Sequence, residues 1–362
     1  MESALNSTKV VPLVHQWLKF LLILLMGVSV AGLTACSTPK KNEVADLVWP
    51  PPPEKPRIKF LAAYHGDSDL GNAPSLLDRA LGGDFAKGLS LSKPYGITAT
   101  DDGKRIYVTD TVQRMVIVFD LEQKKVYPFQ VDATGALLSP IEVRLDETGR
   151  VYITDSMRGS LNIYSPEGKT LMSLGNEQGL KRPTGLALDK KRKRVYVSDT
   201  YAHRIFVFDY GGKLINEIGE RGSDPEQFNY PTNIALDAEG NLYITDSGNF
   251  RVQVYSADGE FVRVFGQMGD SFGSFARPKG VAVDSDNNVY VVDAAFNNFQ
   301  IFNDKDRILL FVGTLGRTLG RFWIPTSIYI DSSDRIYVVD SINARVQVFQ
   351  YIKHEDEVES GQ

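Results

Sequence analysis

The chain has 362 residues, 43% of them hydrophobic, and a formal net charge of −5. This apolar content is sufficient for a sizeable core, and the acidic balance argues against a general electrostatic attraction to nucleic acid. The single cysteine excludes an internal disulfide framework.

Residues 1–35 predict a lipoprotein signal peptide. Lys9 and Lys19 precede an apolar run at 20–31, and small residues lie directly before Cys36. This order is typical of exported chains, and the run is shorter than the ~20 residues that a membrane span needs. Leu33-Thr34-Ala35-Cys36 resembles the bacterial lipobox, which implies that the Cys36 thiol receives a diacylglycerol. The alternative is an uncleaved signal anchor.

A lipidated Cys36 implies an extracytoplasmic protein held at a bacterial membrane by more than one acyl chain, which is a stable form of anchoring. Ser37 at the next position is compatible with sorting to the outer membrane, facing the periplasm. Residues 36–55 are polar and then proline-rich, with Trp49 followed by four prolines. Such a composition predicts an extended, semi-rigid tether.

Residues 57–64 have the pattern of a strand, and residues 67–92 form a long link. Within the link, the segment 75–81 followed by Gly82 predicts a short helix. Links of this length often act as lids or docking elements.

From about residue 93 the chain repeats a Tyr-[Val/Ile]-x-Asp unit six times. The repeated aspartates are Asp110, Asp155, Asp199, Asp246, Asp293 and Asp340. Their spacing of 44–47 residues, obtained by subtracting these numbers, indicates an array of supersecondary units.

Each repeat holds four runs rich in β-branched and aromatic residues, separated by turn pairs such as Asp258-Gly259. Four antiparallel strands per repeat are typical of a propeller blade. The pattern Pro-x-Gly-[Ile/Val/Leu]-Ala-[Leu/Val]-Asp, then Tyr-[Val/Ile]-x-Asp, then Arg-[Ile/Val]-x-Val-[Phe/Tyr] resembles the NHL repeat. The resemblance implies an all-β, six-bladed β-propeller of four-stranded blades.

The last repeat lacks a fourth strand, because a charged tail at 353–362 follows soon after Phe349. Residues 57–64 and Gly66-Asp67-Ser68 echo residues 261–265 and Gly269-Asp270-Ser271. We therefore predict that 57–64 complete the last blade, giving a propeller domain at 56–352. Closure removes exposed strand edges, so a monomer is expected.

The six repeated aspartates are best interpreted as structural, each capping a turn through its carboxylate. Five residues later the NHL pattern has an arginine, matched here by Arg204, Arg251 and Arg345. An arginine–carboxylate contact is the simplest explanation of these three.

Two sets of residues are candidates for binding. The first lies on turns that share one rim of the propeller in this family, and aromatic and arginine side chains there are the usual anchors of binding surfaces. Its members are Arg114, Arg158, Tyr201, Phe250, Phe296, Arg321 and Trp323. The alternative for each is packing against a neighbouring blade.

The second set lies near the propeller axis, two residues after each strand-opening proline. Glu142 and Asn233 interrupt a ring of small residues there, with Tyr95 and Lys279 beside it. Carboxylate and amide oxygens are ligands of Ca²⁺, although that ion takes 6–8 oxygens. Propeller lactonases of a related architecture hold a metal in this way, so Ca²⁺ is a candidate cofactor.

No nucleophile or zinc motif is present, and His65, His203 and His354 are not expected to cluster. The sequence therefore predicts a non-catalytic, membrane-anchored scaffold that binds a protein, peptide or glycan through one rim, without a cofactor and without nucleic acid. The alternative is a Ca²⁺-dependent hydrolase or lyase of small lactones, esters or amides at the axis.

Overall fold

The structure is a computed structural model that describes residues 47–71 and 88–354. Cys36, the signal peptide and the helix predicted at 75–81 lie outside these residues. Within the described part, no helix is long and apolar enough to cross a membrane.

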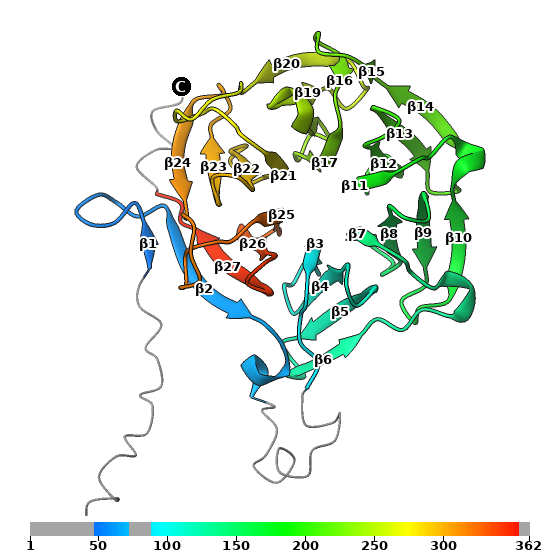
Figure 1. The fold of residues 1–362 in the computed structure, drawn as a ribbon, viewed down its shortest axis with the longest axis horizontal. Coiled ribbons are helices and arrows are strands. Elements are labelled where there is room, and N and C mark those ends of the chain that lie inside the picture. The colour runs from blue at the N-terminus through cyan, green and yellow to red at the C-terminus, as the bar shows by residue number, and fades with distance from the viewer. Residues whose placement is uncertain (1–46, 72–87, 355–362) are drawn as a thin grey trace, which may run out of the picture. The chain divides into compact units, whose positions relative to one another are not determined.

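Six antiparallel sheets stand around a central axis as the blades of a propeller (Figure 1). Blade one holds β3 (Pro94–Ala99), β4 (Arg105–Asp110), β5 (Met115–Asp120) and β6 (Lys125–Pro128). Blade two holds β7 (Pro140–Leu145), β8 (Val151–Asp155), β9 (Ser160–Tyr164) and β10 (Thr170–Leu174). Blade three holds β11 (Pro183–Asp189), β12 (Arg194–Asp199), β13 (Arg204–Asp209) and β14 (Leu214–Ile218).

Blade four holds β17 (Pro231–Leu236), β18 (Leu242–Asp246), β19 (Arg251–Tyr255) and β20 (Phe261–Phe265). Blade five holds β21 (Pro278–Val283), β22 (Val289–Asp293), β23 (Asn298–Phe302) and β24 (Ile308–Val312). Blade six holds β25 (Pro325–Ile330), β26 (Arg335–Asp340) and β27 (Arg345–Tyr351), completed by β2 (Ile58–Tyr64) and β1 (Val48–Trp49).

Short elements connect the blades. They are the parallel pair β15 (Glu220–Arg221) and β16 (Gln227–Phe228), and the 3₁₀ turns η1 (Asp67–Leu70), η3 (Ala133–Gly135) and η4 (Asn176–Gln178). A further 3₁₀ turn, η5 (Ser247–Asn249), lies within blade four between β18 and β19. The predicted all-β, six-bladed fold is confirmed.

The N-terminal strand closes the ring as predicted. Strand β2 pairs antiparallel with β27, from Ile58 opposite Tyr351 to Tyr64 opposite Val346. Ile58 and Phe60 are buried in the core shared by blades five and six. The edge of β27 is thereby covered, which removes a template for aggregation.

The N-terminal boundary differs from the prediction. Residues 47–49 are not part of an extended tether, because Val48 pairs with Lys59 and Trp49 with Ile58. The Trp49 ring packs edge-on against Phe349 at 5.7 Å between centroids. Strand β1 (Val48–Trp49) is therefore a fifth strand of blade six, and the half-buried indole packs on its core.

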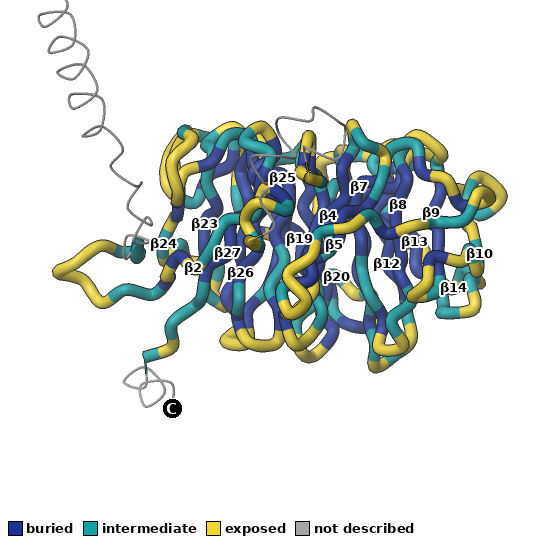
Figure 2. Tube along the Cα trace, turned by 90° about the horizontal axis from the view of Figure 1, so that it is seen from below, coloured by how far each residue is buried: buried dark blue, intermediate teal, exposed yellow. Residues whose placement is uncertain are grey.

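The core lies between neighbouring blades, where β-branched and aromatic side chains of adjacent sheets meet. In five of the six blades the tyrosine of the repeated unit is buried: Tyr152, Tyr196, Tyr243, Tyr290 and Tyr337. Figure 2 shows buried residues along the strands and exposed residues at the turns of the two faces.

The repeated aspartates cap turns, and all six are fully buried. In Asp199, one carboxylate oxygen accepts from the backbone N–H groups of Lys181 and Arg182, at 2.6 and 2.8 Å. The other accepts from Tyr201 and Ala202, at 3.0 and 2.8 Å. Each aspartate thus ties the turn between the second and third strands to the segment that enters the first.

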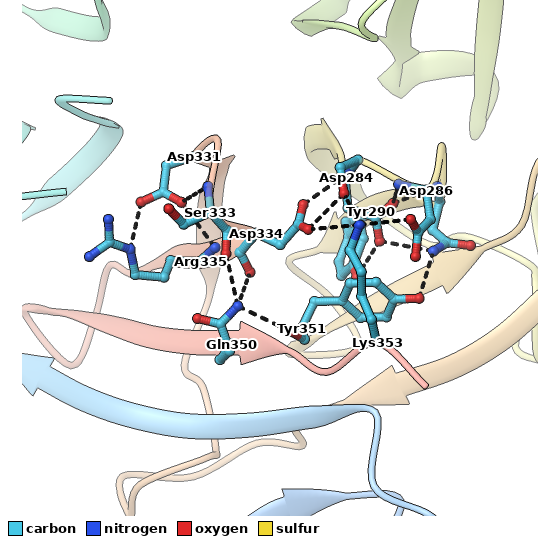
Figure 3. A network of polar contacts seen from close by, with 12 residues as sticks. Asp284, Asp286, Tyr290, Asp331, Ser333, Asp334, Arg335, Gln350, Tyr351 and Lys353 are labelled. Atoms are coloured by element: carbon cyan, nitrogen blue, oxygen red, sulfur yellow. Dashed lines mark hydrogen bonds and ion pairs between the residues drawn. The ribbon is translucent and has the colours of Figure 1, made fainter. Parts of the chain in front are cut away.

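The last described residues are tied to blade five (Figure 3). Asp334 accepts from the backbone N–H of Ser285 at 2.9 Å and from its hydroxyl at 2.7 Å. The Lys353 ammonium lies 2.9 Å from Asp286 and 3.5 Å from Asp334. These contacts join blade six to blade five beside the closing strand.

Candidate functional site

Both sets of candidate residues lie on one face of the propeller. We call it the rim face: it consists of the turns at 111–114, 156–159, 200–203, 247–250, 294–297 and 341–344, and of the residues directly before each innermost strand. The aspartate bonds described above join these two groups of segments. The opposite face carries the turns between first and second strands, such as 146–150 and 190–193.

The three arginines that match the NHL pattern all contact carboxylates. Arg251 Nε lies 2.8 Å from Asp246, and Arg345 Nε lies 2.7 Å from Asp340. Arg204 instead pairs with Glu217 on the neighbouring strand of its own blade, and its Nε is buried without a hydrogen-bond partner in the described part of the chain. The expected contact is therefore present in each, although its partner differs in blade three.

The predicted rim residues divide by exposure. Arg114, Arg158, Tyr201 and Arg321 are exposed, whereas Phe250, Phe296 and Trp323 are half-buried. Phe250 packs against the core shared by blades four and five, as the packing alternative predicts.

Two of the rim aromatics are stacked under arginines. The Arg182 guanidinium lies 4.7 Å from the centre of the Tyr201 ring and donates to its hydroxyl at 2.5 Å. Arg317 lies 4.9 Å from the centre of the Trp323 ring. Such stacks hold a large aromatic surface in a fixed orientation near solvent, which suits a binding anchor.

The same face carries an apolar series of which only Tyr201 was predicted from the sequence. Two residues after the repeated aspartate, four turns expose a large hydrophobic side chain: Val112, Met157, Tyr201 and Ile342, which are 62%, 71%, 52% and 42% exposed. Among the described residues, no hairpin turn of the opposite face exposes one. The available signal in the sequence was the constant spacing of two residues after the repeated aspartate. The prediction selected aromatic and arginine residues of these turns and therefore left out Val112, Met157 and Ile342.

The axial pair, Glu142 and Asn233, meets across the propeller. Although 91 residues separate them, Asn233 Nδ2 donates to Glu142 Oε2 at 2.8 Å. Ser327 donates to the same oxygen at 3.2 Å, and the backbone N–H of Ile97 donates to Oε1 at 3.2 Å. Glu142 therefore links blade two to blades one, four and six, and it is only 1% exposed.

Glycines at the same position of other blades let the innermost strands approach one another. A Cβ atom on Gly96 would lie 2.1 Å from the carbonyl oxygen of Ile141, and one on Gly185 would lie 2.6 Å from Asn233 Cα. Only a position without a side chain fits such an approach. The small-residue ring is therefore a packing requirement, and Glu142 occupies the space left inside it.

The axial donor set does not fit Ca²⁺. The Arg144 guanidinium lies 2.7 Å from Glu142 Oε1 and also donates to the carbonyl oxygen of Ile97 at 2.9 Å. The single carboxylate is thus already paired with a cation, whereas Ca²⁺ takes 6–8 oxygens. In residues 47–71 and 88–354, no group of three or more His, Cys, Asp or Glu side chains could hold a metal.

Cations surround the axis on the rim face, above the Glu142 layer. Lys93, Arg182 and Arg277 directly precede the innermost strands and are exposed, and Lys279 lies two residues after Arg277 and is half-buried. Burial, then Arg277 and Arg182, lower the pKa of Lys279. Burial and the Glu142 charge raise the pKa of Tyr95, against a lowering effect of the same two arginines.

Lys279 and Tyr95 were expected beside the axial pair, whereas Arg182 and Arg277 were missed. A comparison of the residues that precede the six strand-opening prolines would have found them, because Lys93, Arg182 and Arg277 fall on alternate blades. Arg182 also stacks on Tyr201, so the rim and axial sets are continuous.

On the opposite face the axis opens into a cavity of about 410 Å³. Its walls come from the innermost strands of all six blades, and Arg144 and Tyr329 border it. Lys190 pairs with Asp101 at 3.2 Å beside this cavity, and Lys193 pairs with Glu147. The basic turn at 190–194 thus contacts other blades.

Family models match three stretches of the chain. A model described as a 6-bladed beta-propeller matches residues 186–266, and the NHL repeat model matches 275–302 and 322–349. This chain is a six-bladed β-propeller that contains NHL repeats.

Solved structures share the fold of this NHL propeller. A streptogramin B lyase is 13% identical, with a TM-score of 0.55, and the match covers 73% of this chain and 95% of the other. A gluconolactonase from Xanthomonas campestris is 14% identical (TM-score 0.56; 72% and 87% covered). An auxiliary nutrient binding protein from Bacteroides thetaiotaomicron is 14% identical (TM-score 0.57; 73% and 70% covered). Identities this low support the fold and not the activity.

Proposed function

We propose that this NHL propeller is a non-catalytic scaffold that binds a protein, peptide or glycan through its rim face. The observation that carries the proposal is the contrast between the two faces. The rim face exposes Val112, Met157, Tyr201 and Ile342 on equivalent turns, whereas no described turn of the opposite face exposes a large hydrophobic side chain. Exposed apolar surface confined to one face of a protein is a common mark of an interaction site.

The arginine stacks support the same face. Tyr201 under Arg182 and Trp323 under Arg317 place two aromatic rings and two guanidinium groups on this side. These residue types dominate the energetics of measured interfaces. A stacked ring also loses little side-chain freedom on binding, which reduces the entropic cost of association.

The proposal includes an anchor. Cys36 would carry the lipid, and residues up to about 46 would connect it to the propeller, with the outer membrane facing the periplasm as the expected location. The test is metabolic labelling with a radioactive fatty acid: the wild-type chain should be labelled, and Cys36→Ala should not. Labelling of Cys36→Ala, or none of the wild type, would contradict this part.

Partner binding can be tested by crosslinking the anchored protein in cells and comparing two variants. Met157→Ser with Tyr201→Ser removes two exposed apolar groups from the rim face. Leu171→Ser is the matched control, because Leu171 is 49% exposed on the outermost strand of blade two. A specific crosslinked species should persist in the control and fall about tenfold or more in the rim variant. Equal yields from both variants would refute the proposed face.

One observation favours a second candidate function, a hydrolase or lyase of small lactones, esters or amides at the axis. Asn233 Oδ1 is buried without a hydrogen-bond partner in the described residues, directly beside Glu142. Buried polar atoms without partners are rare and often belong to reactive sites. Turnover of a lactone panel by the wild type that is abolished in both Glu142→Gln and Asn233→Leu would establish this function. Turnover that survives either substitution would exclude this site.

A further inference from the structure

We propose that the axial mouth of the rim face binds the oxyanion of an acidic ligand, a carboxylate or a phosphate. The mouth is defined here by Lys93, Arg182, Arg277, Lys279 and Tyr95. The inference rests on the proposed rim-face function and specifies the chemistry of its ligand.

Positive charge is concentrated around this mouth. Residues directly before the six strand-opening prolines, and residues directly after them, include four cations and no acidic side chain. Three of the cations, Lys93, Arg182 and Arg277, come from alternate blades and therefore surround the axis. This local excess of positive charge occurs in a chain whose net charge is −5.

These cations have no carboxylate partner among the described residues. Within residues 47–71 and 88–354, none of the four takes part in an ion pair. Around the axis of the opposite face the pattern is reversed. Arg150 pairs with Asp146 at 2.6 Å, Lys190 with Asp101 at 3.2 Å, and Arg335 with Asp331 at 2.8 Å. A general surplus of basic residues does not explain a difference confined to one mouth.

The side chains of the mouth become more buried along the axis, from the rim face inward. Exposure decreases along each innermost strand: Arg277 before the proline is exposed, Lys279 after it is half-buried, and the next layer, which contains Glu142 and Asn233, is buried. A group that enters along the axis would thus pass the exposed cations and meet Lys279 in a partly desolvated position. Charge–charge attraction is stronger there than at an open surface.

The deepest donors of the mouth, on Lys279 and Tyr95, bind no other described side chain. In the described part of the chain, the Lys279 ammonium makes no hydrogen bond, and the carbonyl oxygen of Lys279 is held by Thr232 at 3.0 Å. The carbonyl oxygen of Tyr95 is held in the same way by Thr326 at 2.8 Å, while the Tyr95 hydroxyl has no hydrogen-bond partner among the described residues. Both backbones are fixed by neighbouring blades, and both side chains retain free donors.

Arg144 pairs with Glu142 from below at 2.7 Å. This pairing reduces the negative charge that the axial carboxylate presents to the rim face. An anionic ligand would therefore meet the mouth cations without strong repulsion from Glu142. A cationic ligand would have no free carboxylate to pair with at this mouth.

The test uses three sugars that differ only in charged group: glucuronate, glucose 6-phosphate and glucose. Lysines of the full-length protein are labelled by reductive ¹³C-methylation, and the Lys279 signal is identified as the one lost in Lys279→Gln. Glucuronate, glucose 6-phosphate or both should shift the Lys279 signal, and glucose should not. No shift with either anion, or an equal shift with glucose, would overturn the proposal. The two anions distinguish a carboxylate from a phosphate ligand.

Thermal stabilisation by the same sugars gives a second measurement that does not require labelling. The effective anion should bind Lys279→Gln about tenfold more weakly than wild type. Lys190→Gln, which removes a cation from the opposite face, should bind it as well as wild type does. Equal affinities for wild type and Lys279→Gln would contradict the inference.

The crosslinking assay separates this inference from the function on which it rests. If Lys279→Gln keeps the partner while Met157→Ser with Tyr201→Ser loses it, the rim face binds but its ligand is not acidic at the axis. If both variants keep the partner, the rim-face function itself is wrong.

Discussion

Removal of the Glu142 carboxylate should destabilise the whole propeller, because this side chain joins four blades. Its two oxygens accept hydrogen bonds from Ile97, Asn233 and Ser327, and they pair with Arg144. Substitution by alanine would leave the Arg144 guanidinium, whose side chain is 11% exposed, without its carboxylate.

The expected loss in the free energy of unfolding follows from the unpaired charge of Arg144. Breaking a buried ion pair by removing one partner costs about 3–5 kcal/mol. Glu142→Gln preserves the volume and one acceptor, and should cost about 1–3 kcal/mol, the range for a lost hydrogen bond to a charged group. Glu142→Leu with Arg144→Met removes both charges and should be less destabilising than Glu142→Ala alone.

Urea unfolding followed by tryptophan fluorescence measures these differences in the free energy of unfolding, provided that the denaturant slope is unchanged. The control is Glu167→Ala, an exposed residue in a hairpin of blade two, which should change stability by no more than about 0.5 kcal/mol. If Glu142→Ala costs less than about 1 kcal/mol, the axial layer does not hold the blades together and the reasoning fails.

Three further predictions follow from the described contacts. Deletion of residues 47–64 should expose the edge of β27 and the core around Ile58, giving unfolded or oligomeric protein in light scattering; a monomer with an unchanged melting temperature would contradict this. Lys279→Met should raise the free energy of unfolding by about 1 kcal/mol, because it removes a half-buried cation that has no carboxylate partner among residues 47–71 and 88–354; a loss of stability in urea would show that Lys279 supports the fold. Burial would raise the pKa of Asp146, but hydrogen bonds from Thr148 and Arg150 outweigh it and lower that pKa. The stabilisation is therefore present above the unfolded-state pKa of about 3.9 and lost as the pH falls below it. Asp146→Asn should flatten this acid dependence, and an unchanged curve would refute the assignment.

The sequence predicted most of the fold because each blade of a propeller is specified by a local sequence pattern. Each blade repeats one pattern of strands and turns, and the missing fourth strand of the last repeat could be matched to residues 57–64 by similarity alone. Strand β1 was not predictable in the same way, since Trp49 is followed by prolines that favour an extended tether. Its pairing with β2 depends on a packing site for the indole against Phe349, and that site exists only after the ring has closed.

The sequence by itself determined the architecture, the structural role of the repeated aspartates, and the fact that Glu142 and Asn233 are exceptions within the repeat. Only the tertiary structure decided what those exceptions do. Closure of six blades brings side chains 91 residues apart within 2.8 Å, and it places Arg144 against the same carboxylate. It also gathers Lys93, Arg182 and Arg277 around one mouth. Contacts across an axis depend on where the blades stand, and no local pattern encodes that position.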